Sequence, residues 1–248
     1  MSGHNKWSSI KHRKAAQDAK RGKAFTKFIR EITVAAKNGD DLESNAPLRA
    51  AVASAKAANM PNDTINRAIA KGVGNTDTSA YEEVVYEGYG PASVAVVVEC
   101  LTDNRNRTAG AVRHSFTKYG GALGSSNSVL FMFDRKGVIY VAASSTDEDS
   151  LTEKVLEAGG DDIELDGENF MITCAMEDFY TVRASLEEQG VEIGESGLER
   201  IPQNRVEITD KDQAEKVLAF IDMLEDDDDV QNVFTNFDLS EEVAGQLE

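Results

Sequence analysis

A dense run of cationic side chains near the beginning of the chain has the chemistry to bind phosphate. Between Gly3 and Lys27 there are eight Lys or Arg residues and a single acid, Asp18. Lys and Arg neutralise nucleic-acid phosphates and release their counterions, while the rings of His and Trp can stack on bases. We expect the nucleic-acid contacts of this segment to come from His4, Lys6, Trp7, Lys11, His12, Arg13, Lys14, Lys20, Arg21, Lys23 and Lys27.

Two further pairs of basic residues could extend this cationic surface. Arg67 and Lys71 are four residues apart on a predicted helix, where a solvated helix surface is the alternative. Arg105 and Arg107 stand at the beginning of another predicted helix, and a helix N-terminus favours anions such as phosphate. The alternative for this second pair is structural, namely capping of the helix by Asp103 or Asn104 together with local ion pairs.

The charge of the chain is unevenly distributed. Residues 1–75 carry 14 Lys or Arg and 6 Asp or Glu (+8), and residues 76–248 carry the remaining 12 and 38 (−26), which together give −18. A polyanion should therefore attract the first part and repel the second. A solvated tail that aids solubility and a mitochondrial transit peptide are the two alternatives for the basic segment.

Enzymatic chemistry has no comparable pattern in this sequence. The three histidines are His4, His12 and His114, and no His–Cys or Ser–His–Asp set can be proposed on spacing. Cys100 and Cys174 each lie in an apolar run, and two cysteines are too few for a disulfide framework or a zinc site. We therefore predict a non-enzymatic protein with no cofactor and no metal, whose thiols are buried and reduced as in cytoplasmic proteins.

Three other sequence features carry less information. The acidic run Glu225–Asp229 lacks the alternating ligands and the glycine of a calcium loop, so we interpret it as a solvated loop. The glycine-rich stretch Gly120–Gly124 lacks the Lys and Ser/Thr of a phosphate-binding P-loop. Because no apolar run approaches the ~20 residues of a membrane-spanning helix, we expect no membrane contact.

Apolar spacing predicts three helices over residues 25–72. Residues recur at i, i+3, i+4 and i+7 from Phe25, which indicates one buried helical face. Pro47 suits the first turn of a second helix, and Asn62 or Asp63 could cap a third. Ahead of them, residues 8–22 are polar on all sides, as expected of an arm that becomes ordered on a polyanion.

After a linker at 73–80, the apolar period changes to two, which indicates strands. Strands are expected at 81–90, 93–101 and 128–133, with a helix of about 104–119 before the third.

A second series of strands and helices follows between residues 137 and 203. Its order is β-α-β-β-α-β, that of ferredoxin-like domains. Thr146 is expected to cap its first helix, and its hairpin is expected to turn at Asp166-Gly167.

The last predicted helix and strand, 211–225 and 230–239, have no sheet of their own. We expect them to complete the first sheet, which makes the 137–203 unit an insertion. The fold class is therefore α+β and multidomain, with an N-terminal three-helix domain and two ferredoxin-like domains, one inserted in the other. The predicted boundaries are 1–78 for the basic arm and helical domain, 79–135 plus 204–248 for the middle domain, and 136–203 for the insertion.

Five motifs, spread in order over essentially the whole chain, resemble the YebC family. This bacterial group has a mitochondrial relative described as a translational activator of cytochrome oxidase. The resemblance implies three domains, and it implies a transcriptional regulator that binds DNA or a factor that acts in translation at the ribosome. The motifs are "GHNKWSSIKHRKAAQDAKRGKAFTKFIREI", "MPNDTINRAIAKG", "YEGYGP", "LTDNRNRT" and "GGALGSSNSVLFMF".

The sequence departs from the family pattern at three positions. Asn5 replaces an expected Ser, Ala122 replaces an expected Asn, and Asn127 replaces an expected Gly. The last two changes remove an amide and a glycine from a loop that could contact a ligand, which weakens a binding role for that loop.

These observations predict a cytoplasmic, monomeric, nucleic-acid-binding regulator of gene expression. DNA and ribosomal RNA are both open as targets, and the acidic domains could meet the ribosome or basic proteins. An arm that is basic on every side suits folded RNA at least as well as duplex DNA. Two hypotheses of other classes also stand: an enzyme that acts on nucleic acid, and an acidic protein-interaction module.

Overall fold

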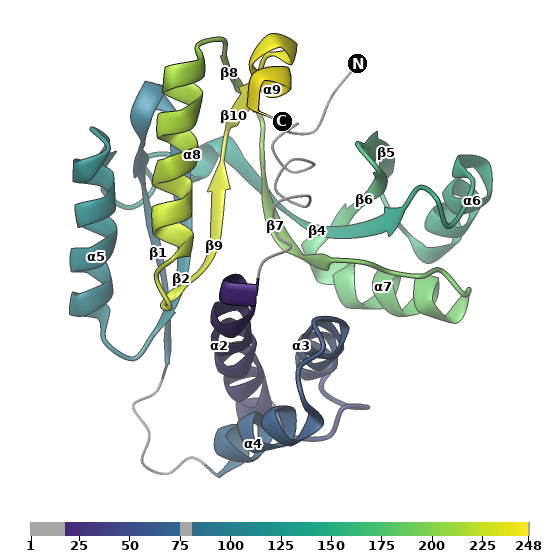
Figure 1. Ribbon diagram of the computed structural model, residues 1–248. Helices are drawn as coiled ribbons and strands as arrows, with labels where there is room; N and C mark the ends of the chain where they lie inside the picture. Colours follow the sequence, from purple (N-terminus) through teal and green to yellow (C-terminus); the bar gives the residue numbers. More distant parts are fainter. Residues whose placement is uncertain (1–17, 75–80, 248) are drawn as a thin grey trace. The chain divides into compact units, whose positions relative to one another are not determined.

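The computed structural model describes residues 18–74 and 81–247, with residues 18–24 as backbone only. Contacts divide the chain into two compact units. The first unit comprises Gln17–Phe131 and Asp212–Thr235, and the second includes Met132–Lys211 and Asn236–Glu248. The chain is an α+β protein, as expected, with a helical N-terminal part followed by sheets (Figure 1).

The first unit begins with the three predicted helices. Their buried faces form one core that includes Ile32, Leu48 and Ile65. The first helix begins at Asp18, earlier than predicted, so part of the expected arm is helical backbone. A side-chain cap by Asn62 or Asp63 was wrong, because Pro61 occupies the N-cap and makes no side-chain bond. The three helices are α2 (Asp18–Ala35), α3 (Ala46–Ala57) and α4 (Asn62–Val73).

Specific polar and small residues hold these helices together. The buried side chain of Asn45 caps α3 by accepting from the Leu48 N–H, and its amide donates to the carbonyls of Ala35 and Gly39 at 2.9 and 2.7 Å. One amide therefore fixes both the end of α2 and the start of α3. At the crossing of α4 with α2, a Cβ on Gly72 would lie 2.4 Å from the Thr33 carbonyl oxygen, so only glycine fits.

A four-stranded antiparallel sheet forms the rest of the first unit, in the order β3-β1-β2-β9. The strand that begins at Val230 joins this sheet, as expected from the sequence, and pairs with β2. The expected third strand at 128–133 was wrong, because the strand lies at 122–123 and residues 130–132 form a 3-10 turn. The elements are β1 (Glu82–Tyr89), η2 (Pro91–Ser93), β2 (Ala95–Thr102), α5 (Arg105–Lys118), β3 (Ala122–Leu123), η3 (Leu130–Met132), α8 (Lys211–Glu225) and β9 (Val230–Thr235).

Helices α5 and α8 pack against each other beside this sheet (Figure 1). The rings of Phe116 and Phe220 meet edge to face, with centroids 4.9 Å apart, and both side chains are fully buried. The contact unites a helix from the middle of the sequence with one near its end. Burying two aromatic side chains in this way contributes several kcal/mol to folding.

The second unit contains a four-stranded antiparallel sheet in the order β5-β6-β4-β7. Helices α6 and α7 cover one face of it, over a core that includes Ile139, Leu151, Ile172 and Leu186. The elements are β4 (Phe133–Ala142), α6 (Glu148–Ala158), β5 (Asp162–Asp166), β6 (Asn169–Ala175), η4 (Met176–Asp178), α7 (Phe179–Glu188) and β7 (Ser196–Pro202).

Two local predictions in this unit need correction. Asp147, not Thr146, caps α6, because its carboxylate accepts from the Ser150 N–H at 2.9 Å. The hairpin loop consists of Gly167 and Glu168, one residue later than expected, since Asp166 still pairs with Asn169. Gly167 has a φ of +61°, a backbone conformation that glycine adopts without strain.

The predicted strand at 230–239 is in fact two strands in different units. After β9, the chain continues as β10 (Phe237–Leu239), which pairs in parallel with β8 (Val206–Ile208). A short helix that the sequence pattern did not reveal, α9 (Glu241–Leu247), follows. The sequence pattern did not show the break, because apolar residues lie on both sides of it, from Val230 to Phe234 and from Phe237 to Leu239.

Candidate nucleic-acid interface

Most of the predicted basic segment lies outside the described residues. This holds for His4, Lys6, Trp7, Lys11, His12, Arg13 and Lys14. Lys20, Arg21 and Lys23 lie on the described backbone of α2, ahead of the half-buried Lys27. Positions 20, 23 and 27 are spaced i, i+3 and i+7, so they share one face of that helix. The helix therefore places three cationic residues in one line.

The second predicted pair, Arg67 and Lys71, lies on the exposed side of α4. The Arg67 guanidinium donates to the Asp63 carbonyl at 3.1 Å and to the Thr64 hydroxyl at 3.3 Å, so it folds back on its own helix. The Lys71 ammonium lies 5.7 Å from the centre of the Tyr81 ring, within range of a cation–π contact. Both cationic groups remain at the surface.

The third predicted pair separates into two environments. Arg105 is exposed, and its carbonyl accepts from the Tyr86 hydroxyl at 3.2 Å. Arg107 instead binds the carboxylates of Asp103 at 2.8 Å and Asp229 at 2.6 Å. Asn104 caps the helix by accepting from the Arg107 N–H. The structure thus shows the ion pairs and the cap that the sequence offered as the alternative for this pair.

Asp229 is the centre of a buried polar cluster that the sequence did not reveal. Its side chain is 4% exposed. It accepts from the Arg30 guanidinium at 2.6 Å, from both Nε and Nη2 of Arg107, and from the hydroxyls of Thr102 and Thr108 at 3.1 and 2.7 Å. The solvated-loop interpretation of the acidic run was therefore wrong for its last residue.

The cluster joins the helical part of the first unit to its sheet. Arg30 comes from α2, and its Nη1 also donates to the carbonyls of Leu101 and Asp228 at 3.1 and 2.6 Å. Its guanidinium further lies 5.6 Å from the centre of the Tyr81 ring. One arginine therefore contacts the ends of β2 and of the α8–β9 loop, which fixes α2 against the sheet.

Two opposing effects act on the pKa of Asp229. Burial raises it, whereas the hydrogen bonds from Arg107, Thr108 and Arg30 lower it and prevail, so the pKa lies below its usual value. The carboxylate is therefore ionised at neutral pH and compensated by two arginines. The sequence carried no local signal of this cluster, because only the fold shows that Thr102 and Thr108 are buried polar residues, which need partners.

A second buried carboxylate, Glu87, organises the loop that follows β3. Glu87 is 5% exposed. It accepts from the N–H groups of Val129 and Leu130 at 2.9 and 2.8 Å, and from that of Asn127. Asn127 has a φ of +65°, which explains why a glycine is expected there and why Asn, which tolerates this conformation, can replace it.

The glycines of this loop serve close packing. A Cβ on Gly88 would lie 2.3 Å from the Ala122 carbonyl oxygen, and one on Gly121 would lie 2.5 Å from that of Tyr89. Strands β1 and β3 could not approach as they do with larger residues here. The stretch 120–124 therefore has a packing role that accounts for its composition without a nucleotide.

The two thiols have little nucleophilic character. Burial raises the pKa of Cys100 to about 12 and that of Cys174 to about 11, and both are free cysteines. Such thiols stay protonated at neutral pH. Within residues 18–74 and 81–247, no group of three or more His, Cys, Asp or Glu side chains is arranged to hold a metal ion. None of the helices within the same residues has the length and hydropathy to span a bilayer.

Comparison with known proteins agrees with this organisation. Two family models match, "TACO1/YebC protein N-terminal domain" over residues 5–75 and "TACO1/YebC second and third domain" over residues 81–237. Two relatives are each called "Probable transcriptional regulatory protein". The one from Persephonella marina is 54% identical and covers 100% of both chains. The one from Syntrophotalea carbinolica is 58% identical and covers 100% of this chain and 99% of its own.

A solved structure is also similar. The conserved hypothetical protein Aq1575 from Aquifex aeolicus superimposes with a TM-score of 0.84 at 46% identity, over 91% of this chain and 93% of its own. The fold described above is therefore the fold of that crystal structure.

Proposed function

This chain belongs to the TACO1/YebC family, and from that premise we propose that it is a non-enzymatic regulator of gene expression that binds nucleic acid through its basic N-terminal part. Its relatives are called probable transcriptional regulators, so DNA is the first target to test. The observation that carries the proposal is the charge partition, +8 over residues 1–75 against −26 over the remainder.

The proposed main contacts are the cationic residues of positions 4–27, with Lys20, Lys23 and Lys27 along one face of α2. Accessory contacts are proposed at Arg67, Lys71, Arg105 and Arg107. Arg107 would reach a phosphate only through the part of its half-exposed guanidinium that is not bound to Asp229. The acidic surface of the sheets would repel phosphate, which orients the bound protein.

The test compares two variants with the same change of charge. In the arm variant, Lys6, Lys11, Arg13 and Lys14 are replaced by Gln; in the control, the exposed Arg113, Lys118, Arg135 and Lys211 are replaced by Gln. Affinity for a 20-base-pair DNA duplex is measured from 50 to 300 mM salt. If the four arm residues all contact phosphates, the slope of log K against log salt decreases by about 3.6, at ~0.9 per contact.

The control variant should keep the slope of the wild type. Equal slopes in the arm and control variants would remove the arm from the interface. A wild-type protein that binds neither DNA nor RNA at 50 mM salt would overturn the proposed function.

A second candidate function is translation, with ribosomal RNA as the target. It is favoured by the basic residues of the arm, which are distributed on every side of the chain and suit a folded RNA that surrounds them. Crosslinking in cells, with bound DNA and RNA sequenced together, decides between the two. Enrichment of ribosomal RNA over promoter fragments would assign the protein to translation.

The proposal also covers the domain boundaries, the cellular location and the oligomeric state. The two sheets, each with two helices, are proposed as ferredoxin-like domains, with 136–203 inserted between 79–135 and 204–248. This is consistent with the pairing of β9 with β2 and with the order β5-β6-β4-β7. A cytoplasmic monomer is proposed, and light scattering of the purified chain tests the monomer.

A further inference from the structure

In the first unit, the face of the sheet that points away from α5 and α8 exposes apolar side chains. Tyr86 of β1 points towards these helices, since its hydroxyl donates to the Arg105 carbonyl in α5. Side chains alternate along a strand, so Val85, Glu87 and Tyr89 lie on the opposite face. Val85 and Tyr89 are 42% and 43% exposed there. These two residues therefore belong to a surface that α5 and α8 do not cover.

A third exposed apolar residue comes from the loop that follows β3. This loop is bound to the same face by the Glu87 carboxylate, which accepts from the N–H groups of Val129 and Leu130 at 2.9 and 2.8 Å. Phe131 follows directly in the sequence, and its side chain is 63% exposed. The two exposed residues of β1 and the phenylalanine of the loop are called the apolar patch below.

The loop that carries Phe131 is anchored at both of its ends. The Gly124 N–H donates to the backbone carbonyl of Glu87 at 2.8 Å, and the side chain of Val129 is fully buried. A segment held in this way loses little conformational entropy when a partner binds to it. The patch is therefore a prepared surface and not a set of apolar residues on a free loop.

Carboxylates border the apolar patch. Glu99 of β2 pairs with Val85, so the two side chains stand side by side on one face. Glu83 lies two residues before Val85 on the same face and is exposed. These charges would repel a polyanion and attract a cationic partner. The part of the chain that carries them, residues 76–248, has a net charge of −26.

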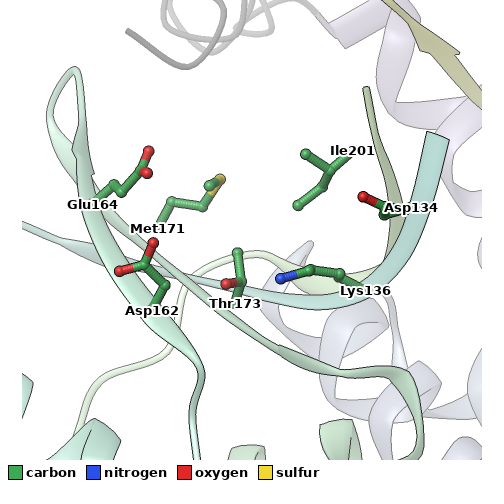
Figure 2. Close-up of a pocket in the computed structure, with 7 residues that line it drawn as sticks. All are labelled: Asp134, Lys136, Asp162, Glu164, Met171, Thr173 and Ile201. Carbon is green, nitrogen blue, oxygen red and sulfur yellow. The ribbon is translucent and has the colours of Figure 1, made fainter. Parts of the chain in front are cut away.

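The second sheet has a face that is equally acidic but differs in its apolar surface. Opposite α6 and α7 lies a hollow of about 200 Å³, lined by the carboxylates of Asp134, Asp162 and Glu164 and by the Lys136 ammonium (Figure 2). Met171, which also lines the hollow, is only 4% exposed. Negative charge is thus common to both sheets, whereas large exposed apolar side chains accompany it on the first.

We infer that the apolar patch, together with Glu83 and Glu99, binds a segment of a partner protein that presents apolar side chains beside Lys or Arg. Aromatic side chains on rigid elements commonly anchor protein interfaces, and charges at the rim select the partner and accelerate its association. The inference goes beyond the proposed function, which assigns nucleic acid to the basic N-terminal part. The chain then joins a nucleic acid to a basic protein.

The first test measures the affinity of the full-length protein for a fluorescent 12-residue peptide of four Lys, four Leu and four Gly residues at 100 mM salt. Phe131→Ser removes one anchor of the patch. Its control, Leu165→Ser, removes an apolar side chain that is 55% exposed in the second unit. We expect Phe131→Ser to weaken binding about tenfold and the control to leave it unchanged. Equal affinities of the two variants would overturn the inference.

The second test separates the two carboxylates from the overall negative charge. The charge variant combines Glu83→Gln with Glu99→Gln, and its control combines Asp162→Asn with Glu164→Gln in the hollow of the second sheet. We expect about fivefold weaker peptide binding in the charge variant only, and a difference that disappears at 500 mM salt. An equal loss in both variants would show that the peptide responds to net charge alone, which contradicts the inference.

The partner itself is identified by replacing Phe131 with the photo-crosslinking analogue benzoylphenylalanine in cells. The expected crosslink maps to a protein segment with Lys or Arg beside apolar residues, and Glu83→Gln with Glu99→Gln abolishes it. Crosslinks to nucleic acid, to a second copy of the chain or to the chain's own second unit would each overturn the inference. The arm variant described above should keep the crosslink, so the two proposals fail separately.

Discussion

Two buried aspartates, one in each unit, show how the same side chain can have opposite effects. Asp229 of the first unit and Asp166 of the second are both almost inaccessible to solvent. Asp229 receives hydrogen bonds from two arginines and two threonines, and its pKa is lowered. At Asp166 burial prevails over the opposing effect of Arg205, and the pKa rises to about 6.

The difference lies in the donors, not in the burial. Moving a carboxylate out of water costs several kcal/mol, and only charged or well-aligned donors offset that cost. The first unit supplies them from α2, α5 and the end of β2, whereas Asp166 stands at a hairpin end among other acids. The comparison predicts that removing the charge of Asp229 destabilises the protein, whereas removing the charge of Asp166 stabilises it.

The largest effect is expected for Asp229→Asn. The substitution leaves Arg30, whose side chain is only 13% exposed, without its anion and turns an amide N–H towards it, so the free energy of unfolding should decrease by about 3–5 kcal/mol. Denaturant unfolding measures this, with the exposed neighbour Asp228→Asn as the control at about 0.5 kcal/mol or less. Equal losses in the two variants would contradict the role of the cluster.

The difference in the free energy of unfolding between the wild type and Asp229→Asn should depend on pH in one direction. Because the pKa of Asp229 is lower in the folded state, its contribution is fully present above the unfolded value near 4 and is lost as the pH falls through the folded pKa. The gap between wild type and Asp229→Asn should therefore narrow under strongly acidic conditions. A gap that is constant down to the acid transition would contradict the lowered pKa.

Glu87 tests whether uncharged donors are enough to offset the cost of burying a carboxylate. Among the described residues its carboxylate is held by backbone N–H groups, and Glu87→Gln places an amide N–H against them. We expect a loss of about 2–3 kcal/mol in the free energy of unfolding. Glu83→Gln, at an exposed position of the same strand, is the matched control, and hydrogen exchange at residues 127–130 should accelerate only in the first variant.

Asp166→Asn should stabilise the protein. The folded pKa of about 6 exceeds the unfolded value near 4, so the folded state loses stability as the pH rises between these values and carries the full cost above pH 6. Removal of the charge should therefore increase the free energy of unfolding by about 1–3 kcal/mol at pH 8. The gain should vanish at pH 4, and a gain that is independent of pH would point to another cause.

The smallest effect distinguishes the two arginines of the third pair. Arg107→Gln should cost about 1 kcal/mol, since its half-exposed guanidinium is screened by solvent and Asp229 keeps Arg30. Arg105→Gln should change the free energy of unfolding by about 0.5 kcal/mol or less. Equal effects of the two substitutions would mean that the ion pair of Arg107 with Asp229 does not contribute to the free energy of unfolding.

The sequence by itself determined the features that depend on local spacing and on summed charge. The buried face of α2, the helix that begins near Pro47, and the alternating strands of both sheets follow from side chains that repeat with the period of their own element. The partition of charge is likewise a property of composition. The family could be named from short motifs, and one of them contains Gly88, whose replacement the packing forbids.

Only the tertiary structure decided which distant residues meet. Arg30 and Asp229 are 199 positions apart, and neither position carries a local signal of its partner. The same holds for the break between β9 and β10, which apolar residues flank on both sides although the two strands belong to different sheets. Local rules fix the conformation of a segment, whereas buried charges are placed by whatever donors the fold brings within 3 Å of them, and that is a property of the whole chain.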